Sequence, residues 1–300
     1  MTALAVDTAL GRELALKGEL RGYGAAMVGF SAGVDSTYLL DVAHEVLGAR
    51  VTAVTADSPS LARSSLAEAE AFCAAQGIRH IIVPTDEFER EEYLANDGQR
   101  CFHCKAALMR AMNGLARATA AGRAAGGQGT ALLLGAIADD LADYRPGMRA
   151  AAAAGARWPL ADLGFTKDDV RARSRARALA SWNRPAEPCL SSRIPYGERV
   201  TVPSLRMIEA AEAELKRLGF SECRARHHRI GESDGFLCRI EVPSADLPRL
   251  LALRDDLLPV LTALGYRSVT IDLAGLQSGG FNRLLDPTSH LAPRTPHLAT

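Results

Sequence analysis

One stretch decides the fold, Phe30-Ser31-Ala32-Gly33-Val34-Asp35-Ser36-Thr37, and it joins two apolar segments. The segment before it, residues 25–30, is short and uncharged, as in a buried strand of a parallel sheet. The segment after it, residues 39–47, repeats apolar side chains at helical spacing, and Gly48 is placed to end that helix. The stretch therefore predicts a tight turn from a buried strand into a helix.

A turn of this kind directs backbone N–H groups at whatever lies above the helix N-terminus, and an anion, most simply a phosphate, suits that position. The pattern Ser-x-Gly-x-Asp-Ser is not a Walker A motif, because no Lys follows the glycine. It resembles the pyrophosphate loop (PP-loop) of ATP pyrophosphatases, which split ATP into AMP and pyrophosphate. From this resemblance we predict an ATP site formed by Ser31, Gly33, Val34, Asp35 and Ser36. The alternative is a tight turn without a ligand.

Two residues of this loop call for a physical explanation. A carboxylate beside a polyphosphate is repelled unless a cation lies between them, so Asp35 is a candidate Mg²⁺ ligand. The alternative is that the helix dipole alone favours an Asp at this position. Ala32 stands where the PP-loop pattern usually has Gly, and its methyl group is expected to crowd the phosphates.

The composition limits the partners and the compartment. The chain has 300 residues, enough for one large or two medium domains, and its 48% hydrophobic and 23% charged residues are typical of a soluble globular protein. Its 35 basic and 35 acidic residues cancel, so neither nucleic acid nor a membrane is an expected partner. No secretory signal or long apolar run is present, so a cytoplasmic location is expected. There the six cysteines are expected to be reduced, metal-bound or reactive.

Strand and helix signals alternate after the loop. Further strands are predicted at residues 51–55, 80–83 and 131–135, with helices between them. This order implies right-handed crossovers and a parallel, doubly wound, Rossmann-like α/β sheet. Residues 86–98 are acidic and are predicted to be exposed, and the arginines of residues 171–177 are predicted to form a solvated surface.

The pattern changes after Pro185, and a domain boundary is predicted there. Residues 1–187 would form the PP-loop ATP pyrophosphatase domain, and residues 188–285 a smaller α+β domain. The smaller domain would contain helices at 203–218 and 245–264 and strands at 223–230, 236–242 and 268–273. The tail, residues 286–300, is rich in Pro and His and is predicted to be disordered.

The cysteines suggest a metal centre. Cys101 and Cys104 have a metal-ligand spacing, but one pair cannot complete a tetrahedral site. Cys189 is the best third candidate, since it lies in a proline-bounded loop close to Arg193, whose guanidinium favours a thiolate. Three cysteines leave one corner of a cubane iron–sulfur cluster open to a further sulfide. Zinc with His103 as the fourth ligand is the competing occupant. The remaining cysteines, Cys73, Cys223 and Cys238, are predicted to be packing residues.

Four motifs occur in a fixed order, at residues 31–36, 100–105, 143–147 and 189–197. Together they resemble the LarE family of ATP-dependent sulfur transferases, from about residue 10 to residue 283. The resemblance implies a small-molecule substrate, pyridinium-3,5-biscarboxylic acid mononucleotide. It also implies adenylylation of a substrate carboxylate with release of pyrophosphate, followed by replacement of an oxygen with sulfur. The product would be the thiocarboxylated precursor of the nickel-pincer nucleotide cofactor of lactate racemase.

The resemblance also assigns cofactors and assembly. Some members of the family sacrifice the cysteine that matches Cys189 and leave dehydroalanine. Others hold a [4Fe–4S] cluster on three cysteines, and Cys101, Cys104 and Cys189 place this chain with them. The expected cofactors are thus ATP, Mg²⁺ and a [4Fe–4S] cluster. A homo-oligomer is implied, of which a hexamer is one form, and residues 188–285 would serve sulfur transfer and oligomerisation. The sulfide source is not indicated.

The chemistry of such a reaction agrees with the residue types present. A carboxylate is a poor electrophile, and adenylylation removes its charge and supplies AMP as a leaving group for attack by sulfide or a thiolate. The substrate's phosphate or carboxylates would be held bidentately by Arg145, Arg193 and Arg224, and the resemblance adds Ser192. The family pattern gives catalytic roles to Cys189 and to Glu212, whose alternative is a surface position on an amphipathic helix.

Three other functions share part of this pattern. A tRNA thiolase that uses the same loop and a similar cluster predicts a basic surface and an RNA-binding segment, and the sequence has neutral charge and no such segment. An amidotransferase-coupled ligase makes the same adenylate but has no need of the three cysteines. A non-enzymatic protein with a degenerate nucleotide site and a zinc-stabilised fold would fail to hydrolyse ATP.

Overall fold

The computed structural model describes residues 8–120, 129–142, 146–231 and 235–277. The chain forms two compact units. The N-terminal unit contains residues Met1–Arg90 and Cys101–Glu187, and the C-terminal unit contains Glu91–Arg100 and Pro188–Thr300. Within the described ranges, no helix has the length and apolarity needed to cross a bilayer.

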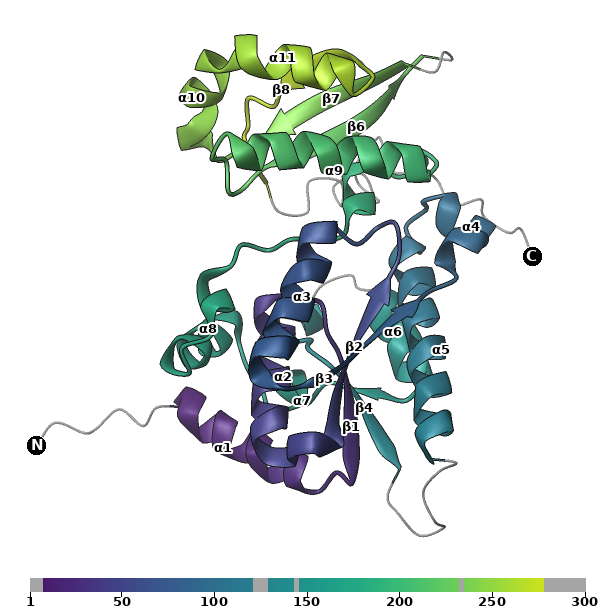
Figure 1. Cartoon of the computed structure of the whole chain (residues 1–300), viewed down its shortest axis with the longest axis vertical. Coiled ribbons are helices and arrows are strands. Elements are labelled where there is room, and N and C mark those ends of the chain that lie inside the picture. The colour runs from purple at the N-terminus through teal and green to yellow at the C-terminus, as the bar shows by residue number, and fades with distance from the viewer. Residues whose placement is uncertain (1–7, 121–128, 143–145, 232–234, 278–300) are drawn as a thin grey trace, which may run out of the picture. The chain divides into compact units, whose positions relative to one another are not determined.

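The N-terminal unit is built on a five-stranded, all-parallel sheet in the order β3-β2-β1-β4-β5 (Figure 1). Its strands are β1 (Ala25–Gly29), β2 (Val51–Asp57), β3 (Arg79–Pro84), β4 (Thr130–Leu134) and β5 (Ala156–Arg157). From β1 the chain moves outward to β3 and then returns to β4 on the other side of β1. Open parallel sheets bind ligands at the carboxyl ends of the strands where the order reverses in this way. The predicted Rossmann-like sheet is confirmed.

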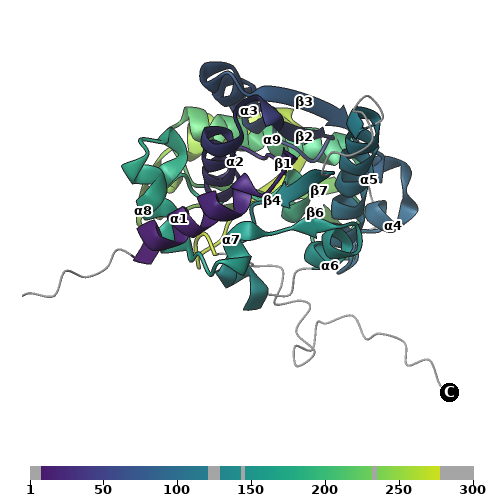
Figure 2. The same cartoon turned by 90° about the horizontal axis from the view of Figure 1, so that it is seen from below.

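Helices cover both faces of this sheet because the side chains of its strands alternate between two cores. On β1, Ala26 and Val28 belong to one core and Met27 to the other. Figure 2 shows α2 and α5 on opposite sides of the row of strands. The first core includes residues of α1 (Thr8–Arg21), α2 (Val34–Leu47), α3 (Arg63–Gln76), α7 (Pro159–Asp162) and α8 (Lys167–Ala176). The second includes residues of α5 (Arg100–Ala120) and α6 (Pro146–Ala153).

The C-terminal unit contains a three-stranded sheet in the order β6-β7-β8, with β6 antiparallel and β8 parallel to β7. Its strands are β6 (Arg224–Ile230), β7 (Gly235–Glu241) and β8 (Tyr266–Ile271). Its helices are α4 (Glu91–Leu94), α9 (Val202–Arg217), α10 (Leu247–Ala252) and α11 (Arg254–Ala263). The single helix expected over residues 245–264 is therefore two helices, separated at Leu253. The predicted disordered tail lies outside the described residues.

Two arginines of residues 171–177 do not belong to the solvated surface that the density of arginines predicts, whereas Arg175 is exposed as predicted. Arg173 and Arg177 pair with Glu13 of α1, whose side chain is 2% exposed. Burial alone would raise the pKa of Glu13, but hydrogen bonds from Arg173 and Lys17, together with the nearby arginine charges, lower it to about 2. The long aliphatic stems of arginine can cover apolar surface while the guanidinium meets a carboxylate. This face of α8 therefore packs against the body of the unit.

The acidic segment that follows β3 was predicted to be exposed, and this is wrong for part of it. Glu87 is 1% exposed, Tyr93 1% and Asn96 0%. Charge composition could not reveal that residues 91–100 fold with the C-terminal unit, where they contact the loop that contains Cys189. The sequence did not predict this excursion of the chain.

Candidate functional site

The predicted turn joins the end of β1 to the start of α2, with Gly33 as the residue before the helix. Two serines hold the turn. The Ser36 hydroxyl lies 3.2 Å from the Ser31 hydroxyl and donates to the carbonyl of Gly33 at 3.2 Å. The first amides of α2 have no partner within the helix and point out of its N-terminus. This arrangement suits an anion at the carboxyl edge of the sheet.

A glycine at the end of β4 lets that strand pass beside the same turn. A Cβ atom at Gly135 would lie 2.9 Å from the backbone nitrogen of Ser36 and 3.1 Å from the carbonyl carbon of Asp35. The first distance is shorter than real Cβ atoms show and the second is tighter than most, so a side chain here would force the backbone of α2 to shift. The strand on which the order reverses therefore lies against the first turn of α2.

Ala32 has a left-handed backbone, with a φ of 57°. This explains the usual preference for Gly, which adopts positive φ without strain. The side chain is 4% exposed and belongs to the hydrophobic core of the unit. Its methyl group thus lies in the core, and the expected crowding of the phosphates stays a prediction. An alanine at this φ carries backbone strain that a glycine would not.

Asp35 is held by a lysine that sequence reasoning missed. The Lys167 ammonium donates to Oδ1 of Asp35 at 2.8 Å and to Oδ2 at 2.6 Å. Lys167 is the first residue of α8, directly after Thr166, whose predicted capping box with Asp169 is confirmed. Its backbone nitrogen donates to Asp139, which lies beyond the end of β4. The only sequence signal for this contact is the helix start that the capping box predicts.

The ion pair between Asp35 and Lys167 occupies the carboxylate that was predicted to bind Mg²⁺. Both carboxylate oxygens of Asp35 bond to Lys167, so the group as arranged here does not fit a divalent cation. A Mg²⁺ ion on Asp35 would require Lys167 to withdraw. What the structure places at the loop is a lysine ammonium, a group that binds phosphate as a point charge.

Cys101 and Cys104 lie in the first turn of α5. Because α5 leads into the parallel strand β4, its N-terminus lies at the carboxyl edge of the sheet, as does the PP-loop. Residues three apart share one face of a helix, so both thiols can serve one site. Gly147 of α6 packs on this turn, since a Cβ there would lie 3.0 Å from the carbonyl oxygen of Cys101. Arg145, a predicted substrate ligand, lies outside the described residues.

The third predicted cluster ligand, Cys189, is exposed and belongs to the C-terminal unit, whereas Cys101 and Cys104 belong to the N-terminal unit. In the described part of the chain, no three His, Cys, Asp or Glu side chains gather in a way that could hold a metal ion. The three-cysteine ligand set therefore stays a prediction, as does the zinc alternative with His103.

The other three cysteines are packing residues, as predicted. Cys73 is 1% exposed, and both Cys223 and Cys238 are 0% exposed. Burial raises the pKa of Cys73 to about 11 and those of Cys223 and Cys238 to about 12. Such thiols are inert, because the thiolate is the reactive form.

The loop that contains Cys189 is held by a buried ion pair. Arg193 is 0% exposed, and its Nε and Nη2 atoms each donate to Glu212 at 2.8 Å. Its Nη1 atom donates to the carbonyls of Pro188 and Cys189 and to the Ser192 hydroxyl. Arg193 therefore meets the backbone of Cys189, and its predicted contact with substrate stays a prediction.

Glu212 is 4% exposed, so the alternative that it is a surface residue of α9 is wrong. Besides Arg193, its Oε1 atom accepts the backbone N–H of Ala225 at 3.0 Å. Glu212 thus joins α9, the start of β6 and the Cys189 loop. Its predicted catalytic role is not tested by these contacts, which are those of a group that orients the loop.

Two arginines and a histidine lie on one face of the small sheet. Arg224, Arg226 and His228 alternate along β6, and alternate residues of a strand share a face. Burial and the nearby charge of Arg193 lower the pKa of Arg224. Burial, Arg239 and Arg226 lower the pKa of His228 to about 4. These shifts indicate a partly buried, positively charged environment, which suits an anionic ligand.

Arg226 connects this face to the Cys189 loop. It donates to the carbonyl of Ser192 at 2.9 Å and to Glu241 at 2.8 Å. Glu241 also meets Arg239 at 3.2 Å, and Arg239 lies directly opposite Arg226 in the sheet. Sequence reasoning missed Arg226, although its spacing from Arg224 on a predicted strand was a usable signal. Predicted substrate residues Ser192 and Arg224 thus belong to one neighbourhood within the C-terminal unit.

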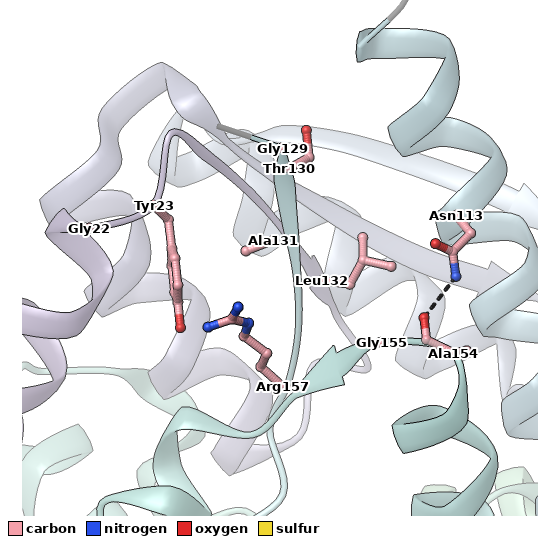
Figure 3. A pocket seen from close by; sticks show the side chains of 10 residues that line it. All are labelled: Gly22, Tyr23, Asn113, Gly129, Thr130, Ala131, Leu132, Ala154, Gly155 and Arg157. Carbon is pink, nitrogen blue, oxygen red and sulfur yellow. Dashed lines mark hydrogen bonds between the residues drawn. The ribbon is translucent and has the colours of Figure 1, made fainter. Parts of the chain in front are cut away.

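A pocket of about 580 Å³ lies elsewhere (Figure 3). It is lined by residues at the amino ends of β1 and β4, among them Tyr23 and Thr130. The Arg157 guanidinium lies over the Tyr23 ring, 5.5 Å from its centroid. In Figure 3 Asn113 points to the Ala154 carbonyl, to which it donates at 3.1 Å. This pocket is at the opposite edge of the sheet from the PP-loop, so we assign it no part in the candidate site.

Comparison with known proteins gives two extended similarities. No family model matches the chain. The chain is 40% identical over 262 residues to an uncharacterized protein of Synechocystis sp., covering 87% of this chain and 92% of that protein. It is 34% identical over 259 residues to the pyridinium-3,5-bisthiocarboxylic acid mononucleotide synthase of Lactiplantibacillus plantarum, covering 86% of this chain and 89% of that enzyme.

Proposed function

The chain belongs to the LarE family of pyridinium-3,5-bisthiocarboxylic acid mononucleotide synthases, and from this premise we propose that it is an ATP-dependent sulfur transferase. It would adenylylate a carboxylate of pyridinium-3,5-biscarboxylic acid mononucleotide and replace an oxygen with sulfur. The product is the thiocarboxylated precursor of the nickel-pincer nucleotide cofactor. The observation that carries the proposal is the Ser31–Ser36 turn at the reversal point of the sheet, where nucleotides bind in folds of this type.

In the first half-reaction, a carboxylate oxygen attacks the α-phosphorus of ATP, and the bond to pyrophosphate breaks. The amides at the N-terminus of α2 would bind the leaving pyrophosphate. Lys167, held beside them by Asp35, supplies a positive charge where negative charge collects. Preorganised charge of this kind stabilises a transition state without reorganisation during the step. Whether Mg²⁺ takes part stays a prediction.

In the second half-reaction, sulfide attacks the carbonyl carbon of the acyl adenylate, and the bond to AMP breaks. The products are a thiocarboxylate, AMP and one proton. A [4Fe–4S] cluster on Cys101, Cys104 and Cys189 would supply the bound sulfide. The exposure of Cys101 and Cys189 and the position of the Cys101–Cys104 turn at the carboxyl edge of the sheet support this assignment.

The substrate would bind through its phosphate and carboxylates to the charged face of β6. Arg224 and Arg226 lie on that face, and the carbonyl of Ser192 accepts from Arg226. Arginine suits this task, since its planar fork matches carboxylate and phosphate oxygens. The proposal includes a cytoplasmic location, with no membrane or nucleic acid as partner. The implied homo-oligomer stays a prediction.

The test is an anaerobic incubation of the full chain with ATP, Mg²⁺, a sulfide source and the dicarboxylated mononucleotide. We expect AMP, pyrophosphate and the thiocarboxylated mononucleotide to appear together, with the mass of the product raised by the replacement of oxygen with sulfur. A parallel reaction with unmodified tRNA as acceptor tests the thiolase alternative. Thiolated tRNA with no thiocarboxylate would replace the proposed function with that alternative.

A further inference from the structure

The loop that contains Cys189 is contacted by a segment from a distant part of the sequence. We propose that residues 93–100, here called the clamp segment, position the Cys189 loop (residues 188–200) for sulfur transfer. The inference rests on the proposed function for the reaction concerned. Its structural basis is independent of that function, since every contact described below lies within the C-terminal unit.

Asn96 makes the central contacts of the clamp segment. Its side chain is fully buried, and Nδ2 donates to the carbonyls of Pro195 at 2.7 Å, Glu198 at 2.8 Å and Ile194 at 3.4 Å. The carbonyl of Asn96 accepts the backbone N–H of Gly197 at 3.0 Å. Asn96 thus bonds to the backbone of four residues between 194 and 198. Its φ of 56° is left-handed, a conformation that Asn tolerates better than most residues.

Two further residues extend these contacts toward Cys189. Arg100 is 4% exposed and donates to the carbonyl of Ser191 at 2.8 Å and to the side-chain oxygen of Asn96. Its guanidinium also lies 5.6 Å from the centroid of the Tyr196 ring. The Tyr93 hydroxyl lies 2.8 Å from the Ser191 hydroxyl. The N–H of Val200 also donates to the carbonyl of Leu94 at 2.9 Å, so the clamp segment contacts the loop from Ser191 to its end.

In these contacts, side chains satisfy the backbone carbonyls of the loop. Apart from one short 3-10 turn at Leu190–Arg193, the loop has no regular structure, so its buried carbonyls need other donors. Asn96 and Arg100 supply them on one side, and Arg193 and Arg226 supply them on the other. The exposed thiol of Cys189 is thereby carried on a backbone with few alternative conformations. A reactive group needs such support to be held in a productive geometry.

The clamp segment ends directly before the Cys101–Cys104 pair in the sequence. Arg100, which bonds to Ser191, is the residue immediately before Cys101. The chain itself therefore connects the element that holds the Cys189 loop to the first cysteine of the Cys101–Cys104 pair. A weakened clamp segment is expected to affect sulfur transfer, whereas ATP binding, which uses the loop at Ser31–Ser36, stays intact.

The test compares three full-length variants with the wild-type chain. Asn96→Gly removes the amide side chain but keeps a residue that accepts positive φ, so it isolates the hydrogen bonds from backbone strain. Tyr93→Phe removes a single hydroxyl and is the milder variant in case Asn96→Gly does not fold. Arg199→Ala is the matched control, because Arg199 of the loop pairs with Glu91, two residues before the clamp segment, and the two side chains are 49% and 69% exposed.

Hydrogen exchange of the amides in residues 190–198, ATP binding and thiocarboxylate formation are measured for each chain. For Asn96→Gly we expect exchange faster by about tenfold or more and thiocarboxylate formation slower by about tenfold, with unchanged ATP binding. Tyr93→Phe should show a smaller change in the same direction, and Arg199→Ala none.

Two results would overturn the positioning role: unchanged exchange in the loop of both variants, or faster exchange with a wild-type rate of thiocarboxylate formation. Failure of the proposed function is distinguishable, since then the wild-type chain itself forms no thiocarboxylate while the exchange difference persists.

Discussion

Replacement of Lys167 by Met tests whether the ammonium beside the PP-loop acts on the nucleotide. In the structure its only described side-chain partner is Asp35, at 2.6 and 2.8 Å, and the two side chains are 39% and 24% exposed. A partly exposed pair of this kind contributes at most about 1 kcal/mol to folding. The variant should therefore fold, with little loss of free energy of unfolding.

The effect on catalysis should be larger than the effect on stability. A hydrogen bond to a charged group contributes about 1.5–3 kcal/mol, and each 1.4 kcal/mol corresponds to a factor of ten. We therefore expect Lys167→Met to lower kcat/KM for AMP formation by about 10- to 100-fold. Because the ammonium lies at the helix N-terminus, where pyrophosphate is expected, ATP binding should weaken while AMP binding changes little.

The assay measures release of AMP and pyrophosphate, and calorimetry measures the binding of ATP and AMP. Lys216→Met is the matched control, since it removes the same charge from the surface of the other unit. Equal losses for ATP and AMP, or a rate within about twofold of wild type, would refute the assignment of Lys167 to the nucleotide.

Three further predictions concern stability and the cluster. Glu212→Ala leaves the guanidinium of Arg193 buried without its carboxylate, so urea denaturation should show the free energy of unfolding lowered by about 3–5 kcal/mol. A decrease below about 1 kcal/mol would contradict the stabilising role of the ion pair. The pKa of Glu13 falls from 4.5 to about 2 on folding, so about 3 kcal/mol of stability is present above pH 4.5 and is lost as the pH falls toward 2. Glu13→Gln should remove that pH dependence, and an unchanged profile would contradict it. Anaerobic reconstitution should give an iron–sulfur absorption band that Cys104→Ala abolishes, and intact mass after turnover should find Cys189 unmodified; zinc without iron, or dehydroalanine, would contradict the cluster.

The elements that the sequence predicted well are those with strong local signals. The turn at residues 30–37 lies between an uncharged apolar run and a periodic helix, and the structure has β1 and α2 there. The capping box at Thr166 specified the start of α8 in the same way. In each case the residues that determine the structure are neighbours in the chain.

The features that the sequence did not predict depend on contacts between distant residues. Lys167 and Asp35 are 132 residues apart, and Asn96 and Pro195 are 99 apart. The acidic composition around Asn96 suggested exposure, because composition does not show which backbone groups a buried amide will satisfy. The buried partners of Arg193 were hidden for the same reason, since a single arginine in a loop is more often solvated.

The central claim is that this chain transfers a carboxylate oxygen to AMP when sulfur replaces it. If the dicarboxylated mononucleotide is labelled with ¹⁸O in its carboxylates and incubated anaerobically with ATP, Mg²⁺ and sulfide, the acyl adenylate retains the labelled oxygen as the bridge to phosphorus. Cleavage by sulfide then leaves that oxygen on AMP. We predict one ¹⁸O atom in AMP for each thiocarboxylate formed. Unlabelled AMP, which arises when water attacks ATP, would contradict the account even if ATP were consumed.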